Sequence, residues 1–153
     1  DGDEYGALNT LIIQQLHSHA ALVEDISQYL VTSGGKRIRP LITLLAAGAV
    51  SHPISSQHIL LATAIEFLHT ATLLHDDVVD MSAMRRGKPT ANANWGNAPS
   101  VLVGDFVYSR AFQLLVQIGS LPVMKILSDT TSKIAEGEVK QLTLIGNLDQ
   151  SCA

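Results

Sequence analysis

The segment from Glu66 to Asp80 begins as an apolar helical pattern and ends in three carboxylates, the other two being Asp76 and Asp77. At about 100° per residue, Asp76 and Asp80 project from one helix face a turn apart, and Asp77 points about a quarter-turn away. Carboxylates at this spacing repel each other, and the helix dipole disfavours negative charge at a C-terminal end. The cluster is either a solvated acidic helix end or a site where a cation offsets the repulsion.

A hard divalent cation suits the oxygens of Asp76 and Asp80. Mg²⁺ typically keeps several waters and bridges one or two carboxylates to substrate phosphates. His69 precedes Asp76 by seven residues, so it shares nearly the same line of the helix, two turns down. His69 is either a core histidine with a satisfied hydrogen bond or a ligand-binding residue, and its alignment with Asp76 favours the second interpretation.

Basic charge is placed locally. Six of the ten Lys and Arg residues lie in two short clusters, residues 36–39 and 85–88, and none lies between Pro40 and Met84. The formal net charge of −4 gives no general attraction to nucleic acid, so we expect no nucleic-acid partner. Two small basic clusters are what a small anionic ligand requires.

The first cluster combines three features of an anion site. Gly34 and Gly35 permit backbone conformations that other residues resist. Lys36 and Arg39 follow, and Pro40 opens the next helix at a position where its missing N–H is harmless. Unpaired N–H groups and the positive dipole end at a helix N-terminus bind anions. The alternative is a basic loop without a ligand.

The second cluster follows the acidic helix end directly. We expect residues 81–99 to form a loop, and a loop of this length is usually functional or disordered. Arg85 and Arg86 in this loop carry planar donors that bind phosphate oxygens, often in a bidentate manner. They are therefore placed to neutralise phosphate oxygens that a metal does not reach.

The remaining pattern predicts an all-α fold in a single domain, residues 1–153. Apolar residues make up 46% of the chain and charged residues 16%, which argues against disorder. Apolar residues recur at threes and fours, and no strand pattern is visible. We expect helices over 1–32 with a break near His19, over 40–50, 57–80, 100–118 and 123–144.

Cysteine usage and hydropathy predict a cytoplasmic protein. Cys152 is the only cysteine, so there is no disulfide framework and no Cys-based metal site. Apolar runs such as Leu41–Val50 are too short to span a bilayer, and no signal peptide is visible, although the chain starts at Asp1 without a methionine.

Two basic clusters and a carboxylate pair on apolar helices together favour diphosphate chemistry. One cluster can bind a diphosphate directly, and the carboxylates can bind a second diphosphate through Mg²⁺. An apolar cavity between helices would suit the hydrocarbon chain of such a substrate. The implied reaction is ionisation of an allylic diphosphate in a dry site, because water would quench the carbocation.

Three segments, in this order and at this spacing, resemble the first three motifs of the trans-prenyl (polyprenyl) diphosphate synthase family: GGKRIRP at 34–40, LHDDVVD at 74–80 and RRGKPT at 85–90. Gly104-Asp105 and residues 135–139 also resemble family sequence, so the resemblance covers nearly the whole chain. It implies an isoprenoid-synthase-type helical bundle, part of it present here, and a homodimer. It further implies Mg²⁺-dependent condensation of isopentenyl diphosphate with an allylic diphosphate such as farnesyl diphosphate.

The resemblance also assigns roles to single residues. The residues that would hold the diphosphate of isopentenyl diphosphate are Lys36, Arg39, His69 and Arg86. Asp76 and Asp80 would ligate Mg²⁺ on the allylic diphosphate, which Arg85 would also contact, and Asp77 would support them from behind. In the family the released diphosphate takes the final proton, so no dedicated side-chain base is expected.

Product length follows from Ala71 and Thr72, which lie five and four residues before Asp76. In the family, bulky aromatic residues at this level stop chain growth early, whereas small residues let the chain pass deeper. The resemblance therefore implies a long product of octaprenyl length, of the kind used for quinone side chains.

One departure from the family is serious. Its members carry a second aspartate-rich motif on a later helix and are considerably longer, whereas no second DDxxD occurs here. We expect this chain to be the N-terminal part of the enzyme, with little or no synthase activity alone. The alternatives are a short-chain farnesyl or geranylgeranyl diphosphate synthase, a non-catalytic partner subunit, helices unrelated to catalysis, and a class I terpene cyclase, which has no obvious use for Gly34–Pro40.

Overall fold

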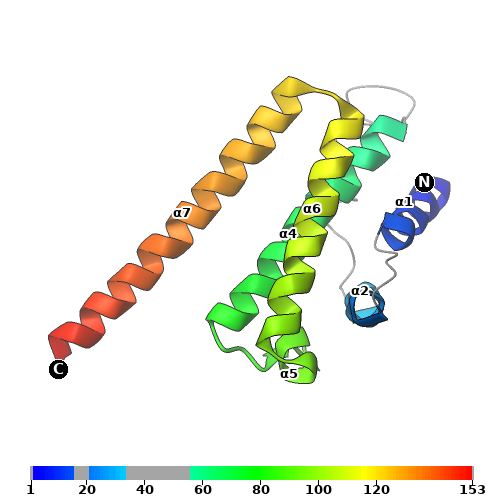
Figure 1. Ribbon diagram of the computed structural model, residues 1–153. Coiled ribbons are helices and arrows are strands. Elements are labelled where there is room, and N and C mark those ends of the chain that lie inside the picture. The colour runs from blue at the N-terminus through cyan, green and yellow to red at the C-terminus, as the bar shows by residue number, and fades with distance from the viewer. Residues whose placement is uncertain (1, 16–20, 34–55, 153) are drawn as a thin grey trace. The chain divides into compact units, whose positions relative to one another are not determined.

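The computed structural model describes residues 2–15, 21–33 and 56–152. The described helices are α1 (Gly2–Gln15), α2 (Ala21–Ser33), α4 (Ser56–Val79), α5 (Ala91–Trp95), α6 (Asn97–Ile118) and α7 (Leu121–Cys152), shown in Figure 1. The all-α prediction is confirmed, apart from a small hairpin of β1 (Met84–Arg85) and β2 (Lys88–Pro89). The helix expected over 40–50 and the break near His19 lie outside the described residues.

The chain divides into two compact units, residues 1–118 and 119–153. The first contains the acidic helix end and the hairpin. The second is the long helix α7, whose surface carries the exposed i,i+4 ion pairs Lys125–Asp129 and Lys140–Glu136. Exposed pairs of this kind stabilise a helix only slightly. The expectation of a single domain stays a prediction.

Helices α4 and α6 form the centre of the first unit and lie side by side in opposite directions (Figure 1). The residues of α6 that are buried recur at threes and fours, which makes one apolar stripe along the helix: Ser100, Val103, Gly104, Val107, Ala111, Leu114 and Leu115. The buried residues of α4 are Ala62, Thr63, Ala64, Phe67, Ala71, Leu74 and Asp77. Burying a Phe or Leu side chain stabilises the fold by about 1.5–3 kcal/mol, so this seam is the main source of stability in the unit.

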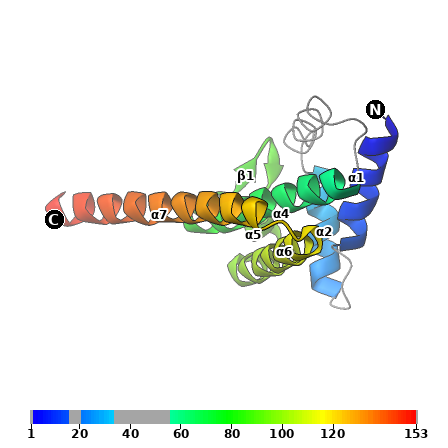
Figure 2. The ribbon, with the colours of Figure 1, turned by 90° about the horizontal axis from the view of Figure 1, so that it is seen from above.

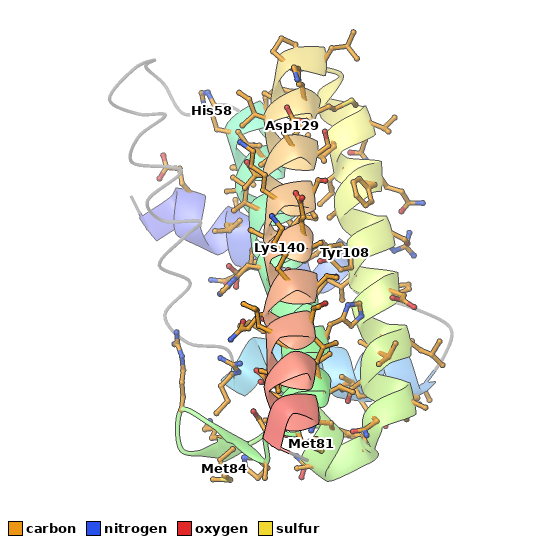
Figure 3. The ribbon with its side chains drawn as sticks, turned by 90° about the vertical axis from the view of Figure 1, so that its left-hand side faces the viewer. His58, Met81, Met84, Tyr108, Asp129 and Lys140 are labelled. Atoms are coloured by element: carbon orange, nitrogen blue, oxygen red, sulfur yellow. The ribbon has the colours of Figure 1, made fainter. Side chains whose placement is uncertain are left out.

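Polar contacts fix the register of α4 against α6. Tyr108, labelled in Figure 3, places its hydroxyl 3.1 Å from the Thr72 hydroxyl. One turn further along α4, the His75 Nε2 atom lies 3.1 Å from the carbonyl oxygen of Val101. A carbonyl can only accept, so Nε2 carries the proton. The His75 ring lies directly against Gly104, where a Cβ would overlap the imidazole.

The segment expected to be an unstructured loop contains the hairpin, which is a correction to the sequence analysis. Met84 pairs with Pro89 and Arg85 with Lys88, enclosing a two-residue turn. Arg86 and Gly87 in that turn have φ of 53° and 77°. Positive φ at both central residues is typical of a type I′ turn, whose twist matches that of a hairpin. The turn was missed because Asn or Asp, rather than Arg, usually precedes the glycine.

Short helix α5 completes this segment. Thr90 is its N-cap, and the Thr90 hydroxyl accepts a hydrogen bond from the backbone N–H of Ala93 at 3.2 Å. Gly96, with φ of 93°, ends α5. Helix α6 then begins at Asn97, three residues before the expected start, because Pro99 is tolerated in a first helical turn.

Within the described ranges, α6 is the one helix long and apolar enough to cross a membrane by length and composition. The expectation that every apolar run is too short overlooked this helix. Core helices of soluble proteins pass the same test, and the buried stripe of α6 packs on α4. The structure therefore does not support a transmembrane segment.

We predict that Gly104→Ala lowers the free energy of unfolding of the full-length protein by about 1–3 kcal/mol, measured by urea denaturation, because the new methyl group overpacks against the imidazole of His75. Gly6→Ala is the control, since nothing lies within 4 Å of its Cβ position and Ala has the higher helix propensity. In the double variant His75→Ala/Gly104→Ala, the loss should be smaller than the sum of the single losses. Strict additivity would contradict the proposed contact.

Candidate active site

Helix α4 ends in a backbone arrangement that presents its acidic residues. The N–H of Ser82 donates to the carbonyl of Asp77 at 2.9 Å, and the N–H of Met81 donates to the carbonyl of Val78 at 3.2 Å. Met81 has φ of 54°. These are the features of a Schellman motif, in which the residue after the C-cap adopts a left-handed conformation. Asp80 is therefore the C-cap of α4.

The three carboxylates have different surroundings. The N–H of Asp80 donates to the carbonyl of Asp76 at 2.8 Å, so one helical turn carries both residues on one side. Asp80 is exposed and Asp76 is half-buried, whereas Asp77 is only 6% exposed. The structure thus separates an accessible pair, Asp76 and Asp80, from a buried third carboxylate.

Asp77 forms an ion pair with Arg85 of the hairpin. The Arg85 Nε atom donates to both carboxylate oxygens at 3.1 Å, and Nη2 donates to Oδ1 at 2.6 Å. These hydrogen bonds raise the pKa of Arg85 above its ordinary value, with smaller contributions from the charges of Asp77, Asp76 and Asp80. Arg85 therefore stays protonated throughout the accessible pH range.

This ion pair defines how Asp77 supports the site. It joins the hairpin to the last turn of α4 and satisfies a buried carboxylate that would otherwise be costly. The side chain of Arg85 is still 42% exposed, and its hydrogen bonds among the described residues use Nε and Nη2 but not Nη1. Arg85 thus has donors left for a ligand, and its contact with the allylic diphosphate stays a prediction.

The accessible pair fits a divalent cation that brings most of its own ligands. Within the described ranges, no ion pair engages Asp76 or Asp80, and no group of three or more His, Cys, Asp or Glu side chains could hold a metal by itself. Mg²⁺ rarely needs such a group, because waters and substrate phosphates complete its octahedron. Two carboxylates a turn apart, neither of them engaged in an ion pair among the described residues, match that mode of binding.

The other predicted site residues are placed as follows. Arg86 is exposed at the tip of the hairpin, which projects beyond α4 on the side away from α6 (Figure 2). His69 is half-buried on α4, two turns before Asp76. Ala71 is fully buried and Thr72 is half-buried. Lys36 and Arg39 lie outside the described residues.

Several residues that hold the site together were missed by the sequence analysis. The hydroxyl of Thr90 and the amide of Asn92 each donate to the carbonyl of Ser82 at 2.8 Å. The N–H of Thr90 donates to the carbonyl of Ala83 at 2.9 Å. Thr and Asn commonly bond to nearby backbone, so these residue types were a weak signal, but their partners could not be read from the sequence.

His75, which directly precedes Asp76, is held by contacts with residues of α6. Besides the Val101 carbonyl, the His75 Nε2 atom lies 3.4 Å from a carboxylate oxygen of Asp105. The imidazole and the Tyr108 ring lie 5.6 Å apart. Asp105 of α6 thus contacts a side chain of α4.

A family model described as polyprenyl synthetase matches residues 20–152. The chain belongs to the polyprenyl synthetase family. It is 53% identical over 146 residues to octaprenyl diphosphate synthase of Escherichia coli strain K12, an alignment that covers 95% of this chain and 45% of that relative. The predicted resemblance to trans-prenyl diphosphate synthases is confirmed.

Solved structures agree with this assignment. A decaprenyl diphosphate synthase from Rhodobacter capsulatus matches with a TM-score of 0.87 and 49% identity, covering 93% of this chain and 44% of that one. A polyprenyl synthase from Caulobacter crescentus CB15, complexed with calcium and isoprenyl diphosphate, matches with a TM-score of 0.85 and 46% identity, covering 92% and 43%. The isoprenoid-synthase-type fold is confirmed, and the chain spans less than half the length of these relatives.

We predict that Asp77→Asn lowers the free energy of unfolding by roughly 1.5–3 kcal/mol in a solution containing EDTA, because the charge-assisted hydrogen bonds to Arg85 are weakened. Asp80→Asn is the matched control, since the same change at an exposed carboxylate without an ion pair should alter stability by less than about 0.5 kcal/mol. Thermal or urea denaturation of the full-length variants measures both. Equal losses would contradict the division between buried and accessible carboxylates.

Proposed function

We propose that the full-length protein is a long-chain trans-prenyltransferase, which condenses isopentenyl diphosphate with an allylic prenyl diphosphate to make an all-trans polyprenyl diphosphate. The observation that carries this proposal is the accessible pair of carboxylates at the C-terminal end of α4, Asp76 and Asp80. The hairpin that carries Arg85 and Arg86 follows directly in the chain. The 53% identity to an octaprenyl diphosphate synthase supports a long product.

The metal part of the proposal uses Asp76 and Asp80. Mg²⁺ held there would neutralise charge on the departing diphosphate of the allylic substrate. No ion pair engages either carboxylate among the described residues, so a cation would also relieve their mutual repulsion. The Caulobacter crescentus relative is complexed with calcium and isoprenyl diphosphate, which supports divalent-cation binding by this family.

The chain's own cations would orient the two diphosphates. Arg85, fixed by Asp77, offers its remaining donors to the allylic diphosphate, and Arg86 at the hairpin tip offers a second guanidinium. Isopentenyl diphosphate would be held by Arg86 and His69, together with Lys36 and Arg39. The released diphosphate would take the proton that ends each condensation, so the described residues need supply no base.

The growing chain would pass along α4 beneath the carboxylates. Ala71 is fully buried on α4, and it is too small to block a polyprenyl tail at this level. We propose an octaprenyl-length product destined for quinone side chains, made by a cytoplasmic homodimer. Thirteen large apolar residues are exposed on the described helices, most of them on α6 and α7, and they are consistent with further covering surfaces.

Two alternatives stay open. A short-chain synthase would use the same metal site but would need a barrier below it, which neither Ala71 nor Thr72 provides. A non-catalytic partner subunit would have no use for the accessible pair Asp76 and Asp80, whose mutual repulsion and position at a helix C-terminus lower the stability of the helix. Incubating the full-length protein with radiolabelled isopentenyl diphosphate, farnesyl diphosphate and Mg²⁺, and then sizing the products, distinguishes all three.

We predict that Asp76→Ala abolishes product formation in this assay, lowering kcat/KM at least about 10³-fold, because half of the protein's contribution to the metal site is lost. The stability of this variant in EDTA should be close to that of the wild type. EDTA added to the wild-type protein should have the same effect on turnover. An active Asp76→Ala variant would remove the metal-site proposal.

Replacing Ala71 should change product length. We predict that Ala71→Phe shifts the product towards shorter chains, because an aromatic ring beneath the carboxylates blocks the path of the tail. Ala71→Ser is the matched control of similar size. Thin-layer or liquid chromatography of the dephosphorylated products measures the shift, and an unchanged distribution for Ala71→Phe would exclude this path.

A further inference from the structure

Tyr29 contacts the arginine hairpin from a distant part of the sequence. Its hydroxyl donates a hydrogen bond to the carbonyl of Pro89 in β2, sixty residues away. Its ring lies edge-to-face on Trp95 of α5, with ring centroids 5.1 Å apart and an angle of 70° between the planes. Tyr29 lies in α2, outside the short sequence motifs on which the family resemblance was based.

The hairpin needs anchors of this kind. Each of its strands has two residues, all of them exposed, and a two-stranded hairpin is marginal by itself. Its turn also places Arg86 at φ 53°, a conformation that costs a non-glycine residue of order 1 kcal/mol. Asp77 holds the first strand through Arg85. The second strand includes Pro89, whose missing N–H leaves its carbonyl as the one backbone group able to bond outward.

We propose that Tyr29 is a positioning residue for diphosphate binding: it fixes the second strand of the hairpin and so sets where Arg86 is presented. The proposal rests on the proposed function for its ligand. Together, Asp77 and Tyr29 hold the hairpin from two different helices, α4 on one strand and α2 on the other. With both anchors in place, the guanidinium groups of Arg85 and Arg86 have a defined separation before any ligand arrives.

Preorganisation of this kind acts on affinity. A ligand that must order a loose hairpin loses binding free energy to that ordering, whereas a fixed hairpin avoids the loss. Removing only the Tyr29 hydroxyl should therefore weaken diphosphate binding about three- to tenfold, the range expected for one hydrogen bond. The edge-to-face contact with Trp95 remains in Tyr29→Phe, so the helix packing is kept.

The first experiment measures the hairpin without a ligand. Full-length Tyr29→Phe is treated with trypsin under native conditions, and cleavage after Arg85 and Arg86 is followed by mass spectrometry. We expect about three- to tenfold faster cleavage there, because native-state proteolysis tracks local opening. Tyr108→Phe is the matched control, since it loses a hydroxyl bonded to Thr72 and should leave this rate unchanged. Equal rates in both variants would overturn the anchor.

The second experiment measures binding of inorganic pyrophosphate with Mg²⁺ by calorimetry. Tyr29→Phe should raise Kd about three- to tenfold with the melting temperature kept, and Tyr108→Phe should leave Kd unchanged. Faster hairpin cleavage with an unchanged Kd would overturn the positioning role. If the wild-type protein binds no pyrophosphate, the proposed function fails, and the cleavage rates still decide whether Tyr29 anchors the hairpin.

Discussion

The ion pair between Asp77 and Arg85 is the interaction on which the candidate site depends. It satisfies a carboxylate that α4 buries, and it fastens the hairpin to the end of that helix. Arg85 is used in this way, and no ion pair engages Asp76 or Asp80 among the described residues. This partly buried pair therefore holds Arg85 in place and leaves the other two carboxylates available to a cation.

The helix pair beneath the site makes this arrangement possible. The His75 ring lies directly against the backbone of Gly104, and its Nε2 atom hydrogen-bonds the Val101 carbonyl and lies 3.4 Å from a carboxylate oxygen of Asp105. These contacts fix the rotation of α4 about its axis next to Asp76. Because residues four apart share a helix face, fixing one turn also fixes where Asp80 points.

Sequence reasoning was sufficient where the physics is local. The apolar spacing predicted α4 and α6 to within three residues at each described end, and the i,i+4 spacing of Asp76 and Asp80 predicted one shared turn. It failed between residues 81 and 99, where it predicted only a loop. Met81 and Arg86 adopt left-handed backbone conformations that neither residue type favours, so no local signal marked them.

The sequence by itself determined the family, the helical class and the candidate ligand-binding residues, because these depend on residue type and on spacing along one helix. Only the tertiary structure decided that Arg85 pairs with Asp77 and that Tyr29 reaches Pro89. Both contacts join different structural elements, and the second joins residues sixty positions apart. The partner in such a contact is chosen by how the helices pack, which the pattern of residues along the chain does not specify.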